Sequence, residues 1–256
     1  MNFLSLISVE FKKIKRSKIL ILLAASLIIL WTPSVLNARL NFHMEDVGIS
    51  PEHNFMIQGF MGMAWFIYPA VMIVCTVLLW QTERGSRGLL KMLSLPLDPR
   101  ALCLAKFLVL LALTAIHMIL MAAAYYISAA AASWFCDYNF LVKPSLALGL
   151  AGKIWLASIP MAAVFWMLSA LIRTPVFSIG IGLASLVPSI LILNTRAWFL
   201  YPACYPFHVV TEEYGRLAEN FGSSGTDPLP WLAAAAVITA VCLGISCICF
   251  GRQETR

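Results

Sequence analysis

The residues of this 256-residue chain that could do chemistry are two adjacent glutamates and two histidines. Glu212 and Glu213 open the sequence Glu-Glu-Tyr-Gly-Arg, and paired glutamates with histidines can hold a metal ion that activates water. His117 and His208 do not stand at a spacing that matches these glutamates. Metal-dependent hydrolysis therefore stays an alternative rather than the leading interpretation.

A phosphate-binding loop is also missing from the sequence. The closest stretch, residues 147–154, reads ALGLAGKI and lacks the first glycine and the final serine or threonine of that pattern. No metal-ligand cluster or Ser/His/Asp arrangement stands out. We therefore predict a non-catalytic chain that binds no cofactor of its own, and any driving energy must come from another chain.

Composition indicates which class of protein must position these residues. Hydrophobic residues make up 61% of the chain and charged residues only 12%, against about 25% charged in ordinary soluble proteins. Several apolar runs approach or exceed the roughly 20 residues that cross a bilayer. The prediction is an all-α integral membrane protein with six transmembrane helices, at Ile19–Leu36, Phe60–Trp80, Phe107–Ala132, Ile154–Ile172, Val176–Leu193 and Leu229–Phe250.

Lysine and arginine are unevenly divided between the segments that flank these runs. With a cytoplasmic N-terminus, the inner segments hold 13 of the 18 basic residues. The positive-inside rule then places both termini in the cytoplasm. Most of the acids fall on the outer side, so the two faces differ in charge.

Residues 1–18 are predicted to form an amphipathic helix on the inner membrane surface. One helical face is apolar and the other faces are basic, which is typical of interfacial helices. The apolar face holds Phe3, Ile7, Phe11 and Ile14, and the basic residues are Lys12, Lys13, Lys15 and Arg16. An acidic lipid surface and a protein partner both fit this pattern.

The segment at residues 81–106 is the longest charged interruption in the hydrophobic first half. Its first part, residues 82–93, places leucines beside basic residues and predicts a short amphipathic helix with one apolar face for a partner. Leu95-Pro96 ends that helix. Asp98-Pro99 begins the next one, because aspartate can cap free backbone N–H groups and proline loses no hydrogen bond there.

Few polar side chains fall within the six predicted spans. None of the runs contains Asp, Glu, Lys or Arg, whose charge would cost at least about 2.5 kcal/mol there, so an ion-driven carrier is disfavoured. His117 lies mid-span and fits either a functional group or a hydrogen-bonded packing residue. Of the seven cysteines, Cys136 and Cys204 fall on the outer side, and whether they pair is left open.

Two stretches of the sequence carry a family likeness: ISVEFKKIKRSK near the start and ERGSRGLLKMLSLPLDPRALCLAK after the second span. They resemble the small six-span permeases of type-2 ATP-binding-cassette (ABC) exporters, especially those of lantibiotic-immunity and bacitracin-resistance systems. Such permeases begin with a surface helix in which glutamate precedes basic residues. After the second span they carry a series of Glu-Arg/Lys-Gly, Leu-Leu, Leu-Pro, Arg and Lys. The likeness is specific over about the first 110 residues.

The resemblance implies a non-catalytic subunit of the bacterial plasma membrane. Its expected partners are two copies of a cytoplasmic ABC ATPase that binds ATP and Mg, a second permease that is identical or different, and membrane lipid, but not nucleic acid. It also implies that residues 81–106 contain a helix coupled to the ATPase. The residues carried over are Glu83, Arg84, Gly85, Arg87, Leu89, Leu90 and Leu93, with Arg100 and Lys106 in the return to the third span.

The longest outer segment, residues 194–229, combines aromatics with acids. Its first part is aromatic and proline-broken, as in a re-entrant hairpin, and its second part is typical of a solvated loop. We predict a substrate rim of Glu212, Glu213, Glu219, Trp198 and Tyr201. Such a rim suits a cationic amphipathic peptide, although charge sorting alone would also leave acids outside.

The predicted function is export of an antimicrobial peptide or antibiotic out of the membrane. Two alternatives stay open: an ABC exporter of lipid or polysaccharide with the same architecture, and an intramembrane peptidase.

Overall fold

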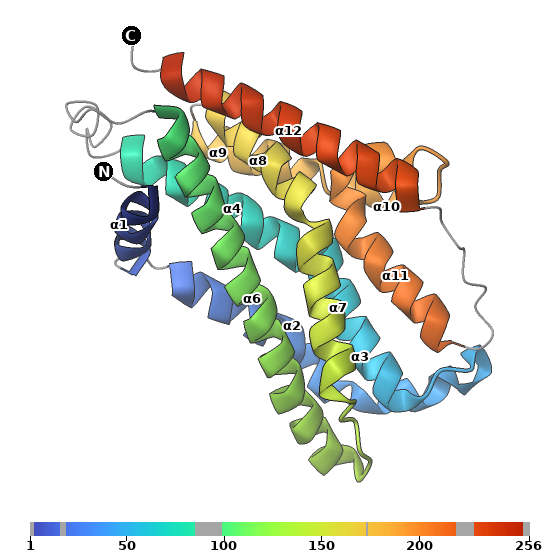
Figure 1. Ribbon diagram of the computed structural model, residues 1–256. Helices are drawn as coiled ribbons and strands as arrows, with labels where there is room; N and C mark the ends of the chain where they lie inside the picture. Colours follow the sequence, from blue (N-terminus) through green and yellow to red (C-terminus); the bar gives the residue numbers. More distant parts are fainter. Residues whose placement is uncertain (1–2, 16–18, 85–98, 173, 219–227, 253–256) are drawn as a thin grey trace.

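The computed structural model describes residues 3–15, 19–84, 99–172, 174–218 and 228–252 (Figure 1). Within these ranges every regular element is helical. The α-helices are α1 (Phe3–Lys15), α2 (Ile19–Leu36), α3 (Pro51–Gly62), α4 (Tyr68–Arg84), α6 (Pro99–Cys136), α7 (Pro144–Ala157), α8 (Ile159–Leu171), α9 (Pro175–Ala184), α10 (Val187–Leu193), α11 (Tyr205–Leu217) and α12 (Pro228–Arg252). Shorter elements are the 3-10 helices η1 (Ala38–Val47), η3 (Trp198–Leu200) and η4 (Pro202–Cys204), and the π-helical turn η2 (Met63–Ile67).

The helices long and apolar enough to cross a bilayer match the predicted spans. Five are Ile19–Leu36, Pro51–Gln81, Pro99–Cys136, Pro175–Leu193 and Leu229–Phe250, and the pair α7 and α8 forms the sixth if its two halves make one bent span. This confirms the predicted fold class, an all-α integral membrane protein.

The second span is longer than its apolar run predicts, because its helix begins at Pro51 rather than near Phe60. Ser50 is extended, and proline is favoured at the first helical position since its missing N–H is not needed there. The π-helical turn η2 then joins α3 to α4 without interrupting the span.

The span formed by α7 and α8 bends by 42° at Ser158. Pro160 explains the break, since it has no N–H to donate to the carbonyl of Leu156. The Ser158 hydroxyl donates to the carbonyl of Trp155 at 2.7 Å, so the neighbouring Tyr68 hydroxyl, at 2.9 Å, must donate to Ser158. A hydrogen bond thus joins the bend to Tyr68, the first residue of α4 after the π-helical turn η2.

The long helices pack into one bundle (Figure 1). α12 lies along α8, α2 along α6, and α11 against α7 and α3. Close approach of α2 and α3 depends on Gly59, because a Cβ atom there would lie 2.3 Å from the Trp31 ring. Trp31 itself is buried and contacts Phe55 and Tyr125.

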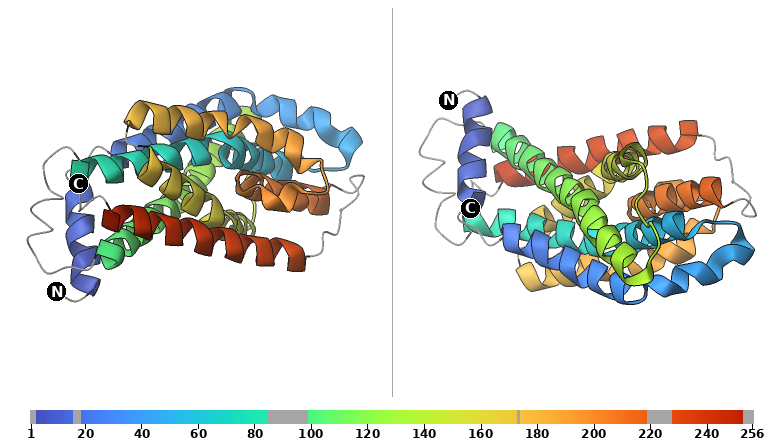
Figure 2. Two further views of the ribbon diagram at one scale, coloured as in Figure 1. Left: turned by 90° about the horizontal axis from the view of Figure 1, so that it is seen from above. Right: turned by 90° about the horizontal axis from the view of Figure 1, so that it is seen from below.

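α1 crosses the bundle at the end where α12 finishes (Figure 2). It precedes α2 in sequence but packs against α6. Its buried face is Leu6, Glu10 and Ile14, which follow one another at helical spacing. Of the predicted apolar face, Ile14 is buried against the bundle, whereas Phe3 and Phe11 are exposed, and the position of α1 on a membrane surface stays a prediction.

Candidate functional site

The predicted coupling residues fall at the edge of the described structure. Glu83 and Arg84 are the last two residues of α4. The other five, Gly85, Arg87, Leu89, Leu90 and Leu93, lie outside the described residues. The coupling helix therefore stays a prediction.

Lys106, expected at the return to the third span, is instead buried within α6. Its Nζ donates to Glu10 Oε2 at 2.6 Å, and Lys13 Nζ donates to Glu10 Oε1 at the same distance. Glu10 is thus held by one lysine from its own helix and one from α6. No short sequence pattern indicates this contact, because 96 residues separate the partners.

The described part of the segment at residues 194–229 differs from the expected solvated loop. Residues 205–217 form α11, whose valines and Glu213 face the bundle while Arg216 points outward. Pro206 in the first turn favours a helix start, and the apolar residues recur at helical spacing. Glu219 lies outside the described residues.

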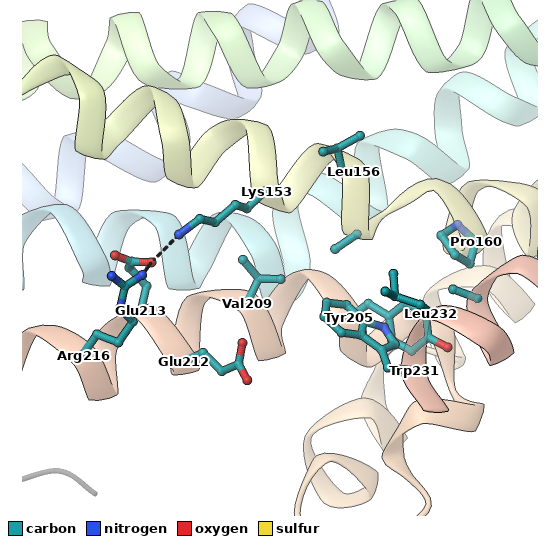
Figure 3. Close-up of a pocket in the computed structure, with 12 residues that line it drawn as sticks. Lys153, Leu156, Pro160, Tyr205, Val209, Glu212, Glu213, Arg216, Trp231 and Leu232 are labelled. Atoms are coloured by element: carbon teal, nitrogen blue, oxygen red, sulfur yellow. Dashed lines mark hydrogen bonds and ion pairs between the residues drawn. The ribbon is translucent and has the colours of Figure 1, made fainter. Parts of the chain in front are cut away.

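Glu213 is the centre of a charged cluster (Figure 3). Its Oε2 accepts a hydrogen bond from Lys153 Nζ at 2.8 Å and one from Arg216 at 3.4 Å. The Glu213 side chain is 6% exposed, whereas those of Lys153 and Arg216 are 51% and 65% exposed. The predicted rim residue Glu213 is therefore neutralised by two cations that reach solvent.

Aromatic rings gather at the start of α11. Trp198 and His208 stack with ring centroids 3.8 Å apart, and Trp231 meets Tyr205 edge-on at 5.5 Å. The Tyr205 hydroxyl donates to the carbonyl of Phe199, and burial raises the pKa of Tyr205 to about 12. Tyr201 lies beside this cluster and donates to the carbonyl of Ser185.

His208 connects the aromatic rings to the charged cluster, since its Nε2 lies 3.3 Å from Glu212. Burial lowers the pKa of His208, and the carboxylate of Glu212 opposes that shift. Glu212 is the more exposed of the two adjacent glutamates, with 37% of its side chain accessible. Of these two glutamates, it is therefore the one that can better meet a ligand.

Between these two groups lies a pocket of about 360 Å³, formed by α7, α8, α11 and α12. Figure 3 shows Lys153, Glu212, Glu213 and Arg216 toward one end, and Tyr205, Trp231, Leu232 and Pro160 toward the other. Such a pocket can take a molecule with a charged part and an apolar part.

Lys153 and Trp231 were not predicted as site residues. Lys153 is an isolated lysine at the edge of a predicted span, and Trp231 begins the last span. Their only sequence signal is an uncommon side chain beside an apolar run.

Of the residues considered for hydrolysis, His208 meets Glu212 at 3.3 Å, but His117 and Glu213 have other partners. His117 is buried in the bundle with its Nε2 3.0 Å from the Ser26 hydroxyl, while Glu213 belongs to the Lys153 cluster. Within the described ranges no group of three His, Cys, Asp or Glu side chains could hold a metal ion. Nothing in this geometry favours a peptidase.

Cys136 and Cys204 are both free thiols. Cys204 is buried, and its thiol donates to the carbonyl of Ser189 at 3.1 Å. The pairing left open by the sequence is therefore not formed in this structure.

The fold and these sites define a multi-pass membrane protein with a buried charge cluster at one end and an amphipathic pocket at the other. Residues 6–189 match the sequence profile of the ABC-2 family transporter proteins, and the chain belongs to that family. It is thus a membrane transport subunit of the ABC-2 permease type, which works with an ABC ATPase. The match ends before α11 and α12. No curated protein matches the chain.

Proposed function

We propose that the chain is the permease of a bacterial plasma-membrane exporter that removes an antimicrobial peptide or antibiotic of the lantibiotic or bacitracin type. Both termini face the cytoplasm, where the segment at residues 81–106 meets the ATPase. Two ATPase copies supply ATP, Mg and the energy, and a second permease completes the path. Lipid surrounds the bundle.

The pocket beside α11 is the observation that carries the substrate class. An exporter of amphipathic peptides needs to hold a charged group and an apolar group at once. Glu212 offers a carboxylate to a cationic group, and Trp231 with Tyr205 offers aromatic surface to an apolar one. The predicted rim residues Trp198 and Tyr201 support this aromatic end.

Susceptibility of cells to a cationic lantibiotic tests the proposal at matched expression of each variant. Trp231→Ala and Glu212→Gln should lower protection, and the effect of Glu212→Gln should be larger at low salt because exposed charges are screened beyond about 10 Å at 0.1 M. Trp134→Ala and Asp137→Asn are matched controls, since Trp134 lies in the last turn of α6 and Asp137 directly follows that helix, both outside the pocket. Unchanged protection in both pocket variants would remove this substrate class.

A second candidate, lipid export, is favoured by one observation. Lys153 and Arg216 are more than half exposed at the charged end of the pocket, and both side chains can bind lipid phosphate. In proteoliposomes with the ATPase, ATP-driven movement of a fluorescent anionic lipid that is lost in Lys153→Gln would support lipid export. Loss of lantibiotic protection in Glu212→Gln, with Lys153→Gln unaffected, would support the peptide.

A further inference from the structure

The ion pair between Glu10 and Lys106 is almost completely removed from solvent. Their side chains are 2% and 1% exposed, and Glu10 Oε2 lies 2.6 Å from Lys106 Nζ. Charged residues are almost never buried to this extent unless they are paired. Within or beside a membrane span such groups usually serve a function, because burying them is costly.

Apolar packing alone could attach α1 to α6. Leu6 and Ile14 lie one helical turn before and after Glu10 and are buried on the same face. An apolar residue in place of Glu10 would extend this stripe without the cost of desolvating a charge. The charge must therefore supply something that apolar contacts do not.

An ion pair differs from apolar packing in that it fixes one register. Apolar stripes can slide along a neighbouring helix at small cost, whereas a buried carboxylate is stable only where it meets its cation. Glu10 selects the position of α1 along α6, because Lys106 is the cation that α6 places against it. Lys13 belongs to the helix of Glu10 itself, so it adds charge balance but no register.

We propose that Glu10 and Lys106 are positioning residues that lock α1 and α6 together, so that the two helices move as one body when the ATPase drives the transport cycle. The inference rests on the proposed orientation, in which this end of the bundle faces the cytoplasm. It does not depend on the identity of the substrate.

Two double variants separate register from simple attachment. Glu10→Leu with Lys106→Met keeps an apolar contact but removes the ion pair. Glu10→Lys with Lys106→Glu restores an ion pair with the charges exchanged. Lys13→Gln is the control, since it removes the other cation of Glu10 but leaves the contact between the helices.

The test uses the full complex with its ATPase in nanodiscs, in a background where the seven native cysteines are replaced. Spin labels at Lys12→Cys and Leu104→Cys, both exposed on the two helices, report the separation of α1 and α6. The distance is measured without nucleotide and with ATP and vanadate. ATP hydrolysis by the same complexes is measured in parallel.

We expect a single, narrow distribution of the distance between the two spin labels in the native pair, the exchanged pair and Lys13→Gln. Nucleotide should not change that distance. The apolar pair should give a broad or nucleotide-dependent distance and should lose the permease-dependent part of ATP hydrolysis. A narrow, unchanged distance in the apolar pair would overturn the proposal, and so would a broad distance in the exchanged pair. Labelling of Lys12→Cys from outside intact cells would instead show that the proposed orientation is wrong.

Discussion

Two charged clusters at different places in this permease are built in a similar way, from one glutamate and two cations, but have different surroundings. In each, one buried glutamate is held by a cation three residues later on its own helix and by a lysine from another helix. The distant lysine is 1% exposed at Lys106 and 51% exposed at Lys153. The Glu10–Lys106 pair is thus sealed between helices, whereas Lys153 and Glu213 line a pocket.

This difference in burial of the distant lysine decides what each cluster can do. The Lys106 side chain is closed off from water, so its ion pair with Glu10 can fix a helix in place. Lys153 and Arg216 can rotate into solvent, so their contacts with Glu213 can be exchanged for contacts with a ligand at little cost. Burial of the cation, more than the type of residue, separates a positioning pair from a binding pair.

The largest expected effect is a loss of protein stability when the sealed cluster, which consists of Glu10, Lys106 and Lys13, loses its glutamate. Glu10→Ala leaves the Lys106 ammonium buried without its carboxylate and should destabilise the protein by about 3–5 kcal/mol. Glu213→Ala should cost no more than about 1 kcal/mol of ion-pair energy, because its cations can reach water. Unfolding of the two purified variants in detergent checks this, and equal losses would end the distinction between the clusters.

A smaller effect concerns the open cluster, which consists of Glu213, Lys153 and Arg216, because the strength of its ion pairs should depend on salt. A double-mutant cycle between Lys153 and Glu213 should give a coupling energy of about 0.2–1 kcal/mol, as for exposed ion pairs. That coupling should shrink in 1 M salt, where the Debye length is about 3 Å. The same cycle between Glu10 and Lys106 should change little with salt, and a strong salt dependence there would show that water reaches the pair.

The smallest expected effect is a pH dependence confined to the pocket. Burial lowers the pKa of His208 below its ordinary value of 6.5, so the unfolded chain takes up a proton there before the folded protein does. Stability should therefore fall as the pH drops below about 6.5, through this side chain.

Thermal midpoints at pH 7.5 and 5.5 measure this loss. Glu212→Gln should enlarge it, because the carboxylate that raises the pKa of His208 is gone. The pH-dependent loss should be smaller in His208→Gln than in the native protein. If His208→Gln loses as much stability between pH 7.5 and 5.5 as the native protein, the pH dependence belongs to another titratable group.

The spans could be predicted from sequence because each one is a local apolar run. The start of the second span could not, since Pro51 starts a helix well before the run begins. α11 was missed because Glu212, Glu213 and Arg216 make its second half look like a solvated loop, although Glu213 faces inward.

The contacts of both clusters join residues far apart in the chain. Lys106 by itself fits the positive-inside pattern, Glu10 stands beside the basic residues of α1, and nothing local pairs the two. Lys153 and Glu213, 60 residues apart, meet only because α11 packs against α7. Such pairs depend on helix packing, which a single sequence does not encode in any short segment.

Labelling of intact cells with an impermeant thiol reagent tests the central claim, that the sealed cluster faces the cytoplasm and the pocket faces outside. Cys136 is the last residue of α6 and is partly exposed, whereas Lys12→Cys would report on α1. Cys204 should stay unlabelled in either case, because it is buried and the pKa of its thiol is raised to about 12. We expect Cys136 to react in intact cells and Lys12→Cys only after the membrane is opened. Reaction of Lys12→Cys in intact cells, with Cys136 protected, would contradict the orientation on which the proposed function rests.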